Sequence, residues 1–251
     1  MKQVSWRAGG CAAVLLGVVT LGGGCADEET GFFIMGNVAL DAPECVASAD
    51  SGSTLLLTGL LDVALRPEYE ATLLVGSQLT PRGDKTNLRS ESMIATITGA
   101  EVRLYRDTGE LDTEFTVPAS GVILPEGGAE AGFGIVTATL IPASTGVALA
   151  AEISNPAEVR TRVARAVVFG TTIGGLDVET SPWSFVIRVC EGCLVDFPAV
   201  ANQDPELGCV PVAGGEAPTS GCRFGQDERR DCRVCTGRNV FCQYPGGVAP
   251  P

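Results

Sequence analysis

The stretch MIATITGAEVRLYRDTGE (residues 93–110) carries the pattern that decides the fold class of this chain. Near its end, Val102 and Leu104 are apolar. Glu101 and Arg103, which alternate with them, are charged. A period of two residues is typical of a strand with one buried face. The DTGE that follows favours a hairpin turn, because Asp and Gly adopt the backbone conformations that such turns need. We therefore expect antiparallel strands here.

Similar short runs recur through residues 54–193, separated by Gly, Pro and Asp. They cover residues 55–65, 70–79, 93–105, 114–117, 121–124, 132–141, 159–170 and 183–190. This pattern predicts an all-β domain of about seven to nine strands, folded as an immunoglobulin-like antiparallel β-sandwich. The segment STGVALAAEIS (144–154) favours one short helix, with Ser144 or Thr145 as its cap and Pro156 after its end.

The first 24 residues have the order of a secretory signal peptide. Lys2 and Arg7 form a short positive region, and the apolar run CAAVLLGVVTL (11–21) and small residues follow it. A retained transmembrane helix over residues 8–25 is the alternative. Several glycines in that span oppose a helix, so we expect residues 1–24 to be removed from the mature chain.

The segment LGGGC, which ends at Cys25, resembles the lipobox of bacterial lipoproteins. In that family the signal peptide is cleaved just before a cysteine, which is acylated. The resemblance implies a lipid at Cys25, with residues 25–53 as a tether to the membrane. Ordinary signal-peptide cleavage near Gly24 is the alternative. Stable anchoring needs more than one acyl chain.

After residue 193 the composition changes: residues 194–242 are rich in Gly, Pro and Cys and poor in large apolar side chains. Such a segment buries too little apolar surface to fold without cross-links, and residues 243–251 are expected to be disordered. A chain that starts at Cys25 has eight further cysteines, an even number that suits a fully paired set in an oxidising compartment. They are Cys45, Cys190, Cys193, Cys209, Cys222, Cys232, Cys235 and Cys242.

Two Cys-x-x-Cys motifs, Cys190/Cys193 and Cys232/Cys235, have other interpretations. Structural zinc would need thiolates, which export to an oxidising compartment disfavours, so we expect no metal and no cofactor. Thiol redox chemistry would need a helix that begins at Cys190, and the Gly-containing residues that follow oppose one. We expect disulfides. Cys45 precedes the first expected strand, and our hypothesis is that it pairs with Cys190 or Cys193.

The chain is acidic, with 30 Asp and Glu against 17 Lys and Arg, and a formal net charge of −13. Such a protein repels phosphate, so we expect no nucleic-acid partner. Arginines gather in residues 222–242, where they either pair with local acids, which we prefer, or form an anion-binding patch. These arginines are Arg223, Arg229, Arg230, Arg233 and Arg238.

The sequence contains no histidine. That excludes Ser-His-Asp and Cys-His nucleophilic sites and disfavours catalytic zinc, so we expect no enzyme and no catalytic residue. A carboxylate pair of the glycosidase type is the alternative, although no spacing singles one out.

The order of LGGGC, a strand-rich body, FVIRVCEGCLV (185–195) and CRFGQDERRDCRVC (222–235) resembles predicted surface lipoproteins of the myxobacterial type. The resemblance implies an exported protein anchored to the outer membrane, facing the periplasm or the cell surface, and it supplies no catalytic residue. We expect a structural or binding module with a protein or glycan ligand. An envelope glycan hydrolase is the alternative.

Overall fold

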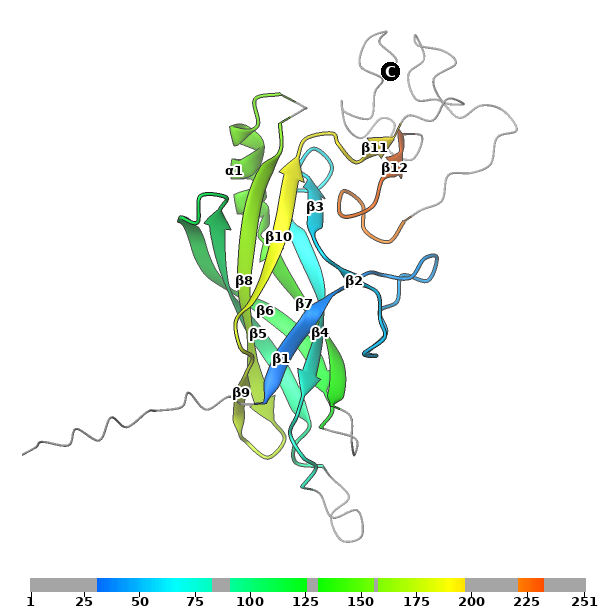
Figure 1. The fold of residues 1–251 in the computed structure, drawn as a ribbon, viewed down its shortest axis with the longest axis vertical. Helices are drawn as coiled ribbons and strands as arrows, with labels where there is room; N and C mark the ends of the chain where they lie inside the picture. The colour runs from blue at the N-terminus through cyan, green and yellow to red at the C-terminus, as the bar shows by residue number, and fades with distance from the viewer. Residues whose placement is uncertain (1–30, 83–90, 126–130, 156–157, 197–220, 233–251) are drawn as a thin grey trace, which may run out of the picture.

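The computed structural model describes residues 31–82, 91–125, 131–155, 158–196 and 221–232. These residues are mostly β, as expected, with one short helix (Figure 1). The elements are β1 (Phe32–Val38), β2 (Leu55–Leu56), β3 (Gly59–Asp62), β4 (Tyr69–Ser77), β5 (Ala95–Arg106), β6 (Leu111–Ile123), β7 (Gly132–Ile141), α1 (Ala143–Glu152), β8 (Arg160–Thr172), β9 (Asp177–Glu179), β10 (Trp183–Cys190), β11 (Val195–Asp196) and β12 (Arg230–Asp231).

Ten of these strands form one sheet in the order β2-β1-β4-β7-β6-β5-β8-β10-β3, with β9 added beside β8. The pairs are antiparallel except for β10 and β3, which run parallel. The sheet is strongly curled, and its edges come close together (Figure 1). Phe32 of β1 bridges to Thr180 after β9, and Leu61 of β3 bridges to Gln226. Residues 221–232 therefore belong to the closure of the sheet.

Six long strands begin or finish at one end of the sheet, which we call the entry end because β1 begins there. Phe32 at the start of β1 lies opposite Ser77 at the end of β4. Ala95 at the start of β5 lies opposite Ile123 at the end of β6 and Thr172 at the end of β8. The β8–β9 hairpin closes this end, while α1 lies at the opposite end (Figure 1).

The alternation within residues 93–110 gives the expected result. Val102 and Leu104 are buried in a core that includes side chains of most of the strands, and Arg103 is exposed. The β5–β6 turn at Gly109 has a φ of +83°, a conformation that suits glycine. Local periodicity therefore identified both the strand and its buried face.

The all-β class is confirmed, but the immunoglobulin-like sandwich of two antiparallel sheets is not. The strands form one continuous mixed sheet, because β8 and β10 pair with each other and β3 joins β10 in parallel. The sheet also begins earlier than expected. Strand β1 lies within residues 25–53, the range predicted to be a tether, and pairs with β4.

The helix is present as expected, but its predicted cap is wrong. Ser144 and Thr145 lie inside α1, and Pro142 occupies the cap position with no side-chain hydrogen bond. Its extended backbone, with a φ of −71°, suits proline, and its carbonyl accepts a hydrogen bond from the Gly146 N–H at 3.0 Å. In the part of the chain that the structure describes, no helix has the length and apolar character needed to span a membrane.

Candidate functional site

The described residues bury one continuous polar cluster, where residues 221–232 dock between β3 and β4. We call this contact the seam. Its members are Asn37, Tyr69, Glu70, Thr72, Arg223, Gln226 and Asp227. Segments more than 150 positions apart in sequence meet there.

Backbone hydrogen bonds hold the docked segment to the otherwise open edge of β3. The Asp227 N–H donates to the Leu60 carbonyl at 2.8 Å, and the Asp62 N–H donates to the Gly225 carbonyl at 2.9 Å. The Leu60 N–H in turn donates to Asp227 Oδ1 at 2.8 Å. Gly225 and Asp227 both have positive φ, 78° and 60°, so this is a tight turn pressed against an edge and not a regular strand.

Side chains of the same segment bind the start of β4, whose backbone β1 leaves uncovered at that point. The Gln226 amide accepts from the Glu70 N–H at 3.0 Å and donates to the Glu70 carbonyl at 2.7 Å, as a neighbouring strand would. Arg223 donates to the Glu70 carbonyl and to Thr72 Oγ1. It also pairs with the Glu70 carboxylate at 3.3 Å. The seam thus completes backbone hydrogen bonding where the sheet stops.

Tyr69 forms the centre of the cluster and is fully buried. Its hydroxyl donates to Asp227, with 2.9 Å between Oη and Oδ2, and accepts from Asn37 Nδ2 at 3.0 Å. Asn37 in turn accepts from the Thr72 N–H at 2.9 Å. Gly59 packs so closely on Tyr69 that a β-carbon there would lie 2.5 Å from the hydroxyl oxygen. A side chain at residue 59 would therefore displace the phenol.

Burial governs the protonation of these groups. It raises the pKa of the Asp227 carboxyl, and hydrogen bonds from the Leu60 N–H, Gln226 and Tyr69 only partly offset the effect. Burial and the nearby Asp227 carboxylate raise the pKa of Tyr69 well above 10, so the phenol keeps its proton and donates it. Burial lowers the pKa of Arg223, although Glu70 opposes this.

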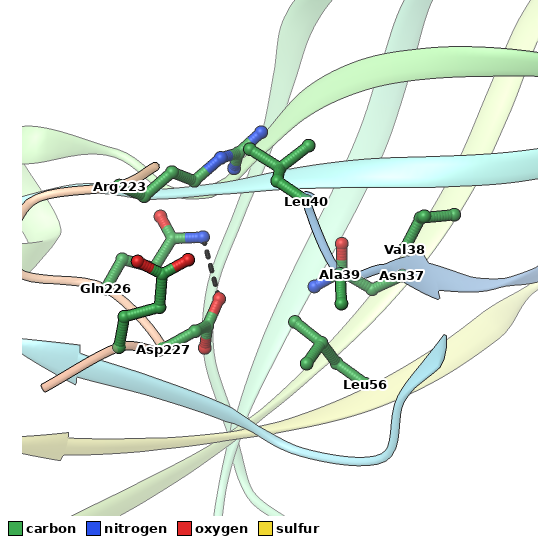
Figure 2. A pocket seen from close by; sticks show the side chains of 9 residues that line it. Asn37, Val38, Ala39, Leu40, Leu56, Arg223, Gln226 and Asp227 are labelled. Carbon is green, nitrogen blue, oxygen red and sulfur yellow. Dashed lines mark hydrogen bonds between the residues drawn. The ribbon is translucent and has the colours of Figure 1, made fainter. Parts of the chain in front are cut away.

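A cavity of about 80 Å³ adjoins the seam (Figure 2). Arg223, Gln226 and Asp227 lie on one side of it, as Figure 2 shows. Leu40 and Leu56 contribute apolar atoms to its lining. This volume holds a few water molecules or a small polar group. Because the polar side chains of the wall already bond to one another, the arrangement stabilises the closed sheet and presents no activated nucleophile.

A disulfide between Cys45 and Cys222 ties the docked segment to the loop that follows β1. It spans 177 positions. The hypothesis that Cys45 pairs with Cys190 or Cys193 is therefore wrong. Residues 221–232 return to the start of the sheet and place Cys222 beside Cys45, while Cys190 and Cys193 pair with each other.

The VCEGCL motif (residues 189–194) forms a tight turn at the end of β10, and the backbone of this turn binds the side chain of Asp62. The buried Asp62 carboxylate accepts from the N–H groups of Gly192 at 2.7 Å and Leu194 at 2.9 Å. Burial raises the pKa of Asp62, and these backbone bonds oppose it. No helix begins at Cys190 within residues 190–196, so the feature required for a redox motif is missing there.

The same turn has the spacing of a partial metal site, because a carboxylate oxygen of Asp62 and the two sulfur atoms lie within 4.8 Å of one another. The sulfur atoms of Cys190 and Cys193 are bonded to each other, however, and offer no thiolate. Cys232 of the second motif is disulfide-bonded as well. This supports the interpretation of the described cysteines as cross-links.

A cleft of about 250 Å³ beside α1 contains two carboxylates, Asp112 and Glu152, and therefore bears on the hydrolase alternative. The buried Arg162 lies between them and bonds to each at 2.9 Å. Burial opposes ionisation of Asp112, but hydrogen bonds from Arg106 and Arg162 outweigh it and lower the pKa of Asp112. A glycosidase acid needs a raised pKa, and the lowered pKa of Asp112 is the opposite of that requirement. Arg162 holds both carboxylates in salt bridges.

Several predicted residues lie outside the described residues: Cys25, Cys209, Cys235, Cys242, Arg233 and Arg238. The signal peptide, the residue-243–251 tail and the lipid at Cys25 therefore stay predictions. Of the described arginines, Arg230 pairs with Glu228, which agrees with local pairing, whereas Arg223 pairs with Glu70 of β4, far along the chain. Arg229 is exposed.

Sequence reasoning missed the seam. One signal for it existed: Asn37 and Tyr69 are isolated polar side chains within or beside apolar runs. A polar group in such a position needs a buried partner. The pattern does not say which distant residue supplies it.

Comparisons of the chain with protein-family models, curated proteins and solved structures find no match.

Proposed function

We propose that this chain is an exported lipoprotein, anchored to the outer membrane through Cys25, whose β domain is a structural or binding module of the cell envelope. Its ligand would be a protein or a glycan at the cell surface. The lipobox-like LGGGC and the signal-like residues 1–24 supply the sequence basis for export and anchoring.

The Cys45–Cys222 disulfide is the observation that carries the proposal. Disulfides of this kind persist in oxidising compartments and are rare in the cytosol. This one holds a segment with few large apolar side chains to a sheet that needs it for closure, as a stable extracellular scaffold requires. The cleft beside α1 gives the hydrolase alternative no support, because Arg162 holds both of its carboxylates in ion pairs.

The test is the intact mass of the chain after export by a bacterial host, measured with and without reductant. We expect a chain that starts at Cys25 and carries acyl groups, and we expect disulfides that reductant opens. Peptide mapping should recover Cys45 joined to Cys222. The matched control is Cys25→Ser, which should lose the acyl groups and the membrane association but keep that disulfide. A wild-type chain that is cleaved near Gly24 and carries no lipid would overturn the anchoring.

A further inference from the structure

The described chain enters the sheet at a fixed point. The Gln78 N–H donates to the Gly31 carbonyl at 2.8 Å, and the next residue, Phe32, bridges to Thr180 beside β9. Phe32 is also buried. These contacts hold the start of β1 at the entry end, next to the β8–β9 hairpin.

The connection from this point to the proposed anchor is short. Phe32 follows Cys25 by seven positions, and a fully extended chain of that length spans at most about 25 Å. The longest strands, β6 and β8, have 13 residues each and are about 40 Å long. A lipid at Cys25 therefore keeps the entry end within reach of the bilayer, whatever the position of the end that carries α1.

The β8–β9 hairpin at the entry end has an uncharged, apolar tip. Ile173 is 61% exposed and Leu176 is 50% exposed. Gly174 and Gly175 lie between them, and the Thr172 N–H closes the turn by donating to the Leu176 carbonyl at 2.8 Å. Exposed apolar area is unfavourable in water, and insertion between lipid headgroups would remove it from water.

A second pair of exposed apolar side chains lies close by. Val122 and Leu124 at the end of β6 are 55% and 54% exposed. Thr96 of β5 pairs with Val122 on one side and with Thr171 of β8 on the other. The end of β6 and the hairpin are thus two strand spacings apart, or roughly 10 Å. Both can meet one flat surface.

Charge indicates the kind of surface. Asp177 and Glu179 of β9 are exposed beside the hairpin, and residues 27–30 of the connection to Cys25 are DEET. These carboxylates would repel anionic headgroups. A zwitterionic bilayer surface fits both the apolar tip and the acidic surroundings.

We propose that the entry end docks on the lipid bilayer, with Ile173 and Leu176 inserted at headgroup level and a preference for zwitterionic lipid. This proposal rests on the lipid anchor at Cys25. In it, the short tether sets the orientation of the domain on the membrane. The end of the domain that carries α1 would then face away from the membrane and be available to a ligand.

The test places a tryptophan at the hairpin tip and, as a matched control, at the opposite end. The variants are Leu176→Trp and Val147→Trp, the latter on α1 at a position that is 63% exposed. Each full-length, processed and acylated chain is bound to phosphatidylcholine–phosphatidylethanolamine vesicles that contain a doxyl-labelled quencher lipid. Trp183 gives the same background in both variants. Vesicle flotation reports the anchor, and fluorescence quenching reports docking.

We expect both variants to float with the vesicles. Quenching of Leu176→Trp should be several-fold stronger than that of Val147→Trp, with emission shifted to shorter wavelength. Adding phosphatidylglycerol should weaken this quenching. Flotation with equally weak quenching at the two positions would overturn the docking and leave the anchor intact. The same result is expected if the tip binds a protein partner instead of lipid. Failure of both variants to float would overturn the anchor together with the docking.

Discussion

Folded proteins usually bury apolar side chains and expose polar ones. The seam and the entry end each depart from this distribution, in opposite directions. At the seam, Tyr69 and Gln226 are polar and almost completely buried. At the entry end, Ile173 and Leu176 are apolar and exposed. Buried polar groups that satisfy one another specify a structure. Exposed apolar groups that do not pack in the core are instead suited to contact with a surface outside the chain.

The two regions also differ in how they are built. The β8–β9 hairpin at the entry end joins strands that are neighbours in sequence, so local turn chemistry is sufficient to form it. The seam joins β3 and β4 to residues 221–232, far along the chain, and its closure includes a disulfide. The long-range cross-link therefore lies where local sequence cannot hold the sheet together.

Removing the long-range disulfide should have the largest effect on stability. A loop of this length predicts a loss of roughly 5 kcal/mol in the free energy of unfolding for Cys45→Ala with Cys222→Ala. The matched control, Cys190→Ala with Cys193→Ala, opens a very short loop and should lose about 2 kcal/mol. Denaturant unfolding of both double variants measures the difference. Equal losses would contradict the view that the seam depends on its disulfide.

Breaking the polar cluster should have a smaller but clear effect. Asp227→Ala leaves the Leu60 N–H and the Tyr69 hydroxyl without their acceptor, and we expect a loss of about 1–3 kcal/mol. Asp177→Ala, at an exposed carboxylate of the entry end, is the control and should change stability by about 0.5 kcal/mol or less.

A double-mutant cycle isolates the contact itself. Tyr69→Phe and Asp227→Ala should couple by about 0.5–3 kcal/mol, because the two side chains share one hydrogen bond. Additive losses in denaturant unfolding would show that the phenol and the carboxylate do not support each other.

The pH dependence of stability should have opposite signs at two aspartates. The folded pKa of Asp227 is raised, so its contribution to the free energy of unfolding declines as pH rises from about 4 through that raised pKa. The folded pKa of Asp112 is lowered, so its contribution is lost as pH falls below about 4. Each pKa unit corresponds to about 1.4 kcal/mol.

The measurement is the free energy of unfolding of the wild type, Asp227→Asn and Asp112→Asn at matched pH values between about 3 and 8. The difference between the wild type and each variant gives the contribution of that aspartate. If the two differences changed in the same direction with pH, the seam would not bury its carboxylate more effectively than the cleft beside α1.

The same contrast explains what the sequence could predict. The strand that contains Val102 and Leu104 follows from local alternation, because burial of one face imposes a period of two. Strand β1 escaped prediction because Gly36 and Asn37 interrupt its apolar run, although Asn37 is buried against Tyr69. Periodicity identifies the inward face of a strand but not the order in which strands pair, so a sandwich and one curled sheet share the same signal.

The seam was beyond local reasoning for a related reason. Asp227 binds Leu60 across 167 positions, and RFGQDE (223–228) reads in isolation as a solvated loop. Cysteine pairing has the same limit: an even count indicates that cross-links exist, whereas the partner of Cys45 depends on where the chain returns. Composition could show that residues 194–242 need cross-links, but only the fold shows what those links close.

The smallest expected effect is at the entry end, and it decides whether the comparison is correct. If Ile173 and Leu176 serve an external surface, replacing both with Ser should leave the free energy of unfolding within about 0.5 kcal/mol of the wild type, because neither side chain fills the core. The matched control is Ile187→Ser at a fully buried position of β10, which should be strongly destabilised because it leaves both a cavity and an unsatisfied hydroxyl. Denaturant midpoints measure both variants. A large loss in the hairpin variant would mean that its apolar tip stabilises the sheet itself, and the contrast between a polar structural seam and an apolar contact surface would no longer hold.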